Sequence, residues 1–169
     1  MKVKNLLFGI LLVFLSGNIL SQTFTNVAQQ IGITSTYFDD YYIPGGGAGF
    51  ADYDNDGDID LLIAGRTNFI FYRNDNGNYT DVTSQTGINF TGDCLKSVVW
   101  GDYNNDGWTD LVLAGEWMPI TVFRNDKGIF TNQTIATGIA DRIGWWNSLA
   151  AGDFDNDGDI DYVAGNLGL

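Results

Sequence analysis

The chain has 169 residues, a formal net charge of −13 and 44% hydrophobic residues, enough apolar content for a folded core. Its acidity argues against a nucleic-acid partner, because phosphate binding depends on clustered lysine and arginine. Histidine is absent, which excludes histidine-containing catalytic triads and the usual zinc sites, whereas enzymes that use only carboxylates are compatible with the composition.

Residues 1–21 have the pattern of a secretory signal peptide. Lys2 and Lys4 supply a positive start, residues 6–15 are apolar, and small residues precede a predicted cleavage after Ser21. The apolar run is shorter than the roughly 20 residues of a membrane span. We therefore expect an exported mature chain, residues 22–169, without a transmembrane span; an uncleaved anchor is the alternative. The expected location is extracellular or at the cell surface, or the periplasm or outer membrane of a Gram-negative cell.

Three acidic loops of nine residues recur about fifty residues apart. Each has oxygen-bearing side chains at loop positions 1, 3, 5 and 9 and a glycine at position 6. Calcium takes about six to eight oxygen ligands, and alternate side chains of a tight loop can point at one centre. Thirteen of the 21 acidic residues lie in the loops, where a cation would neutralise them. The pattern predicts Ca²⁺ sites in the sequences DYDNDGDID (52–60), DYNNDGWTD (102–110) and DFDNDGDID (153–161).

Short apolar runs surround each loop in a repeated order. One run precedes the loop, a second follows it and ends in glycine, and in the first two units a third and a fourth run come next. Runs of this length between turn residues suit buried strands. Four strands in a repeat of about fifty residues are typical of a β-propeller blade. The predicted fold is all-β, with the acidic loop between the first and second of four antiparallel strands, in blades at 45–88 and 95–139 and a partial blade at 146–169.

The fourth-strand pattern also follows the predicted signal peptide, as Phe24-Thr25-Asn26-Val27 with Gly32-Ile33. We expect residues 24–33 to form an outer strand that closes the last blade of a ring. Three units fall short of the usual four to eight blades. The sequence therefore predicts a partial propeller whose remaining blades are missing from this chain; a small structural oligomer is the alternative.

The loops with their flanking strands resemble the FG-GAP or VCBS repeat, the blade of integrin-α-like propellers, over residues 24–169. The stretch 145–155 is similar to secreted bacterial proteins of the ASPIC and UnbV group, which includes relatives of cartilage acidic protein. The resemblance implies a calcium-stabilised propeller on the cell exterior. It also implies a role in adhesion or in binding a protein or carbohydrate ligand.

The resemblance further implies which atoms bind calcium: side chains at loop positions 1, 3, 5 and 9 and the backbone carbonyl at position 7. In this sequence they are Asp52, Asp54, Asp56 and Asp60 with the carbonyl of Asp58; Asp102, Asn104, Asp106 and Asp110 with the carbonyl of Trp108; and Asp153, Asp155, Asp157 and Asp161 with the carbonyl of Asp159. The second loop carries less charge, so we expect it to bind calcium most weakly. An EF-hand fits poorly, because position 12 is never glutamate.

Catalysis is not predicted from these residues. Glu116 is the only glutamate, and Lys96 and Arg142, which we expect outside the strands, are only loose candidates for the base of a polysaccharide lyase. The alternative function is a noncatalytic module of a secreted polysaccharide-degrading enzyme. Trp117, Trp145 and Trp146 are candidates for ligand binding at the surface, although packing between blades is the favoured interpretation.

Overall fold

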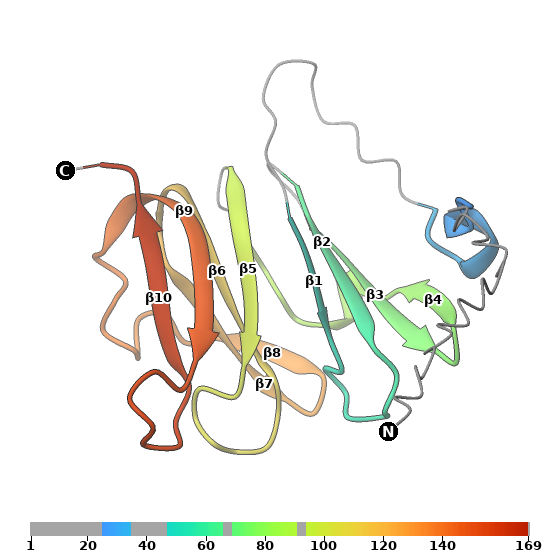
Figure 1. Cartoon of the computed structure of the whole chain (residues 1–169). Coiled ribbons are helices and arrows are strands. Elements are labelled where there is room, and N and C mark those ends of the chain that lie inside the picture. Colours follow the sequence, from blue (N-terminus) through green and yellow to red (C-terminus); the bar gives the residue numbers. More distant parts are fainter. Residues whose placement is uncertain (1–24, 35–46, 66–68, 91–93, 169) are drawn as a thin grey trace, which may run out of the picture.

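The computed structural model describes residues 25–34, 47–65, 69–90 and 94–168, and this part of the chain is almost entirely β-structure (Figure 1). The first sheet is the predicted blade of four antiparallel strands. They follow one another in the sheet in chain order: β1 (Gly47–Ala51), β2 (Asp60–Ala64), β3 (Phe69–Asp75) and β4 (Asn78–Asp81). The first acidic loop joins β1 to β2, as the sequence predicts.

The second unit repeats this arrangement and continues into the third. Its strands are β5 (Leu95–Gly101), β6 (Asp110–Pro119), β7 (Thr121–Asp126) and β8 (Ile129–Asn132), followed by β9 (Ile143–Gly152) and β10 (Asp161–Asn166). Strand β6 pairs with β5 and β7 over its first half. Its last residues pair with the start of β9, so the second and third units share one sheet. All pairings are antiparallel, which confirms the all-β class and the order of strands in each blade.

An apolar core lies between the first two units. Phe71 of β3 is fully buried and meets Tyr53 edge-on, with ring centroids 4.6 Å apart, and Trp100 of β5 at 5.7 Å. Phe130 of β8 completes this aromatic group at 5.9 Å from Phe71. Burying one such aromatic side chain stabilises a fold by roughly 1.5–3 kcal/mol. The contacts between blades are therefore as important to the fold as the strand pairing within them.

The predicted outer strand at 24–33 is wrong over its described residues. Ala28–Ile31 is instead a 3₁₀ helix, in which the Asn26 side chain accepts the N–H of Ala28 at 3.1 Å and Gly32 ends the turn with φ 94°. The same sequence pattern after β4 behaves alike, with a 3₁₀ helix at Thr83–Gln85. The pattern thus encodes a strand only in its first residues, and a turn-forming Asx side chain ends that strand early.

The N-terminal segment nevertheless has a defined place. Gly32 lies so close to the carbonyl of Tyr79 in β4 that no side chain would fit there. Gly87 lies in the same way against Phe130 in β8, where the N–H of Phe130 donates to Thr86 at 2.7 Å. The N-terminal segment therefore contacts the first sheet as the segment after β4 contacts the second.

Two expectations concern the membrane. The predicted signal peptide, residues 1–21, lies outside the described residues. Over the described ranges, no helix is both long and apolar enough to cross a bilayer.

Two equivalent asparagines fasten the turns that follow β3 and β7. Asn74 donates to the carbonyl of Ile59 at 2.9 Å and accepts the N–H of Gly77 at 2.7 Å. Asn125 makes the matching bonds in the second unit, to Thr109 and Gly128. Its amide also donates to the carbonyl of Tyr53 at 2.7 Å, which is a bond between units.

We predict that Asn125→Ala lowers the free energy of unfolding by about 1–3 kcal/mol more than Asn74→Ala, because only the first change strands a buried carbonyl of the neighbouring unit. Urea denaturation of both variants followed by circular dichroism measures the difference. Equal losses would show that the bond between units contributes nothing.

Candidate metal centre

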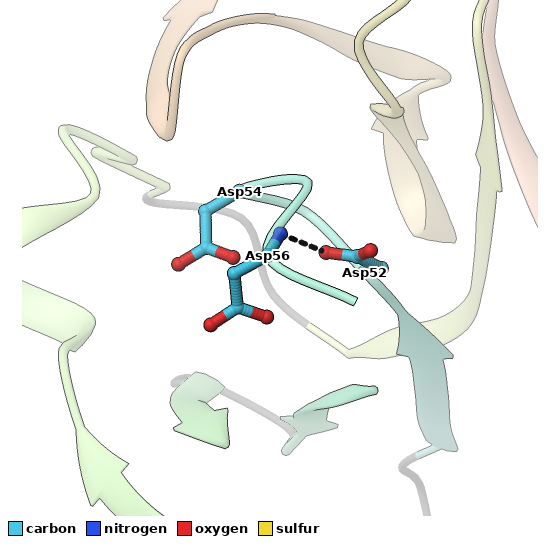
Figure 2. Close-up of side chains that lie close together, drawn as sticks. All are labelled: Asp52, Asp54 and Asp56. Atoms are coloured by element: carbon cyan, nitrogen blue, oxygen red, sulfur yellow. Dashed lines mark hydrogen bonds between the residues drawn. The ribbon is translucent and has the colours of Figure 1, made fainter. Parts of the chain in front are cut away.

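Each acidic loop is shaped by its first aspartate. Asp52 accepts the N–H of Asp56 at 3.1 Å and that of Gly57 at 3.0 Å, which curls the loop around its carboxylate (Figure 2). Asn55 and Gly57 have φ of 58° and 95°, a left-handed conformation that asparagine and glycine tolerate best. The other two loops repeat these bonds through Asp102 and Asp153.

Three carboxylates converge in the first loop. Asp52, Asp54 and Asp56 each offer an oxygen, and these oxygens all lie within 4.8 Å of one another (Figure 2). In the third loop Asp153, Asp155 and Asp161 form the same kind of group. Asp54 Oδ1 is buried and has no hydrogen-bond partner among the described residues. A buried, unpartnered carboxylate oxygen beside two further carboxylates fits a hard cation such as Ca²⁺.

The last aspartate of the loop does something the sequence analysis missed. Asp60 is 1% exposed; one of its oxygens accepts the N–H of Tyr53 at 3.0 Å and the other that of Asn74 at 2.8 Å. Asp110 binds the N–H groups of Tyr103 and Asn125 in the same way, at 3.1 and 2.6 Å. These carboxylates join the start of the loop to the end of the third strand of the unit, and Asp60 lies outside the group formed by Asp52, Asp54 and Asp56.

The third loop differs at this position. Asp161 accepts the N–H of Phe154 at 2.9 Å and also belongs to the cluster with Asp153 and Asp155. The sequence offers one sign of the structural role: in the first two units an Arg-Asn-Asp turn with a buried asparagine follows at a similar distance, at residues 73–75 and 124–126.

Burial disfavours the ionised carboxylates at the end of the loop. It raises the pKa of Asp60 to about 6, and the nearby charges of Asp54 and Asp56 raise it further. The backbone N–H groups of Asn74 and Tyr53, which donate to Asp60, act in the opposite direction and lower this pKa. The pKa of Asp110 is raised to about 6, again mainly by burial. Burial and the neighbouring Asp56 charge also raise the pKa of Asp54. A nearby cation would favour the ionised forms of all these groups.

The second loop has the same backbone but fewer charges. Asn104 accepts the N–H of Asp106 at 2.9 Å, and Asp106 accepts that of Trp108 at 3.0 Å. Among the described acidic residues, the groups of three that could hold a metal lie in the first and third loops. The second loop matches them in shape only.

The three loops are linked into a row at one end of the strands (Figure 1). The side-chain amide of Asn55 donates to the carbonyl of Gly107 at 3.2 Å. The amide of Asn105 donates to the carboxylate of Asp159 at 2.5 Å. Both donors occupy loop position 4, so each loop reaches the next with the same residue.

Antiparallel blades with acidic loops between their first two strands are typical of propeller-like repeat proteins. Comparison with known protein families supports this class. The model of the FG-GAP-like repeat matches residues 52–113 and 102–164, and the chain belongs to this family. FG-GAP repeats are typical of extracellular or surface proteins, are generally noncatalytic and commonly bind Ca²⁺. A search of curated proteins found no match. The closer resemblance to the ASPIC and UnbV group stays a prediction.

We predict opposite effects of two isosteric changes when calcium is removed with EGTA. Asp60→Asn should lower the free energy of unfolding by about 1–3 kcal/mol, because an amide nitrogen would face a backbone N–H donor. Asp54→Asn should leave it unchanged or raise it, because the change removes one charge from a crowded cluster. Urea denaturation in EGTA measures both, and a similar loss in the two variants would contradict the division of roles.

Proposed function

We propose that this chain is an exported calcium-binding repeat module in which Ca²⁺ closes the acidic loops and stabilises blades that serve adhesion or ligand binding. The observation that supports calcium most directly is the buried, unpartnered Oδ1 of Asp54 beside two further carboxylates. Membership of a family typical of extracellular and surface proteins supports the location. Calcium at the millimolar level found outside cells suits sites of modest affinity.

The proposed ligands in the first loop are the carboxylates of Asp52, Asp54 and Asp56 with the carbonyl of Asp58. In the third loop they are Asp153, Asp155, Asp157 and Asp161 with the carbonyl of Asp159. Asp60 and Asp110 act mainly by holding their loops, and their role as ligands remains a prediction. Two carboxylates at this spacing repel by on the order of 1–3 kcal/mol, depending on screening by solvent. When bound, the cation would remove this repulsion, so its binding free energy would become folding free energy.

The proposal includes no catalytic step. Lys96 lies within β5, not outside the strands as the sequence analysis expected, and its ammonium is 3.0 Å from the Glu116 carboxylate in a half-buried ion pair. This ion pair already engages the Lys96 ammonium, which disfavours Lys96 as the base of a lyase.

Removal of calcium should lower the melting temperature of the chain by on the order of 10 °C, because loop closure and folding are linked. Differential scanning fluorimetry with millimolar Ca²⁺ and then with EGTA measures the shift. Asp56→Ala should remove part of it, whereas Asp141→Ala, an exposed aspartate outside the loops, should leave it intact. A melting temperature indifferent to calcium would overturn the proposal.

Asn104→Asp should tighten calcium binding to the second loop by several-fold, since ligand charge tunes calcium affinity and the new carboxylate can still accept the N–H of Asp106. Asn132→Asp adds the same charge in β8, outside the loops, and should change affinity little. Isothermal titration calorimetry resolves the sites. Second-loop binding that is already the tightest in the unmodified chain would contradict the expected order.

A further inference from the structure

Two tryptophans lie exposed at the junction of the second and third units. Trp117 of β6 is 72% exposed and Trp145 of β9 is 37% exposed. Their ring centroids are 5.7 Å apart and their planes are inclined by 31°. Tryptophan gains more from burial than almost any other side chain, so a paired exposure of this kind marks a binding surface.

The backbone presents Trp117 at a cost. Its φ is 58°, in the left-handed region that a bulky side chain rarely adopts, and it is the extra residue of a bulge where β6 pairs with β9. The second unit has one residue more between Gly115 and Ile120 than the first has between Gly65 and Phe69. The Trp117 side chain does not fill the core, so packing does not explain why the strained backbone is kept. Such strain points to a function of the side chain.

The backbone of Trp145 is held by residues at the end of β10 and just after it. The backbone N–H of Trp145 donates to the Asn166 side chain at 3.1 Å, and its backbone carbonyl accepts the N–H of Leu167 at 2.9 Å. The neighbouring Trp146 is used differently: its ring packs over Gly144, and its indole N–H donates to the Arg142 carbonyl at 3.3 Å. Trp117 and Trp145 thus form a pre-positioned pair, while Trp146 supports the strand.

The surroundings of the pair are electrically balanced, although the chain is strongly acidic. Lys96 is paired with Glu116 at 3.0 Å, and Arg142 lies 3.6 Å from Asp141. The acidic loops lie at the opposite end of the strands, because β6 begins and β9 ends at its own loop (Figure 1). Over the described residues, a ligand of this surface therefore meets aromatic faces and charges that are balanced in sign.

The exposed area of the two rings indicates how large a ligand they can cover. A buried aromatic side chain contributes roughly 150–250 Å², so at 72% and 37% exposure the pair offers on the order of 150–300 Å². A stable protein interface buries about 800 Å² on each partner. Two open, inclined rings also lack the enclosure of an aromatic cage for a cation. One or two pyranose rings, with their apolar C–H faces and outward hydroxyls, match this area and neutrality.

We propose that Trp117 and Trp145 form a stacking platform for a neutral carbohydrate. The inference rests on the proposed ligand-binding role and names the class of ligand, but it does not depend on calcium in the loops. The platform lies at the end of the strands away from the proposed metal sites.

The test is titration of the full chain with neutral cello-, xylo- and mannooligosaccharides, followed by tryptophan fluorescence and calorimetry. Trp117→Gly is the decisive variant, because glycine relieves the left-handed backbone while the stacking face is lost. We expect a melting temperature that is kept or raised, with affinity reduced about tenfold or more. Trp145→Ala should weaken binding similarly, and Ile135→Ala, which removes an even more exposed apolar side chain elsewhere, should not.

The platform would be overturned if no neutral oligosaccharide bound at millimolar concentration, or if Trp117→Gly left the affinity unchanged. It would also be overturned if only choline bound, or if the chain formed a dimer that Trp117→Gly dissociates. Destabilisation of the fold by Trp117→Gly would show that Trp117 has a structural role instead. Calcium-dependent melting, measured on the same samples, separates the two proposals. A retained calcium shift without saccharide binding rejects the platform and leaves the calcium module standing.

Discussion

The rest of the structure depends on a buried carboxylate that ends each of the first two acidic loops. Asp60 and Asp110 give both oxygens to backbone N–H groups, one at the start of their own loop and one at the end of the unit's third strand. Charge-assisted hydrogen bonds of this kind are stronger than neutral ones and replace part of the hydration that burial removes. These bonds fix the position of the loop relative to the sheet. The carboxylates of Asp52, Asp54 and Asp56 can therefore converge on one point.

This arrangement divides the aspartates of one motif between two tasks. The last residue holds the loop, and the earlier ones form an exposed or half-exposed cluster whose charges oppose one another. Burial works against the holding residue as well, since it raises the pKa of Asp60 to about 6. A fold that gathers so much negative charge gains stability from any cation that the cluster accepts. The bonds from Asn55 and Asn105 to the next loop extend this dependence from blade to blade.

Local, repeated features were predictable from the sequence, and features that depend on neighbouring units were not. Glycine and aspartate at fixed spacing located the loops and strands, because turn geometry is decided by a few adjacent residues. The role of Asp60 required knowing that Asn74 returns to it across the sheet. The predicted strand at 24–33 failed because an apolar, β-prone pattern continued past Asn26, whose side chain starts a turn. The pairing of β6 with β9 joins two units, and no pattern within one unit predicts it.

Strands β6 and β9 connect the two ends of the blades. Strand β9 runs from Trp145 to the third acidic loop, and β6 runs from the second loop to Trp117, so the tryptophan pair and two loops share the same two strands. A strand paired on both sides transmits little bending, and β6 has partners along most of its length. The pairing of β6 with β9 therefore fixes where Trp117 and Trp145 leave the sheet, independently of any ion in the loops.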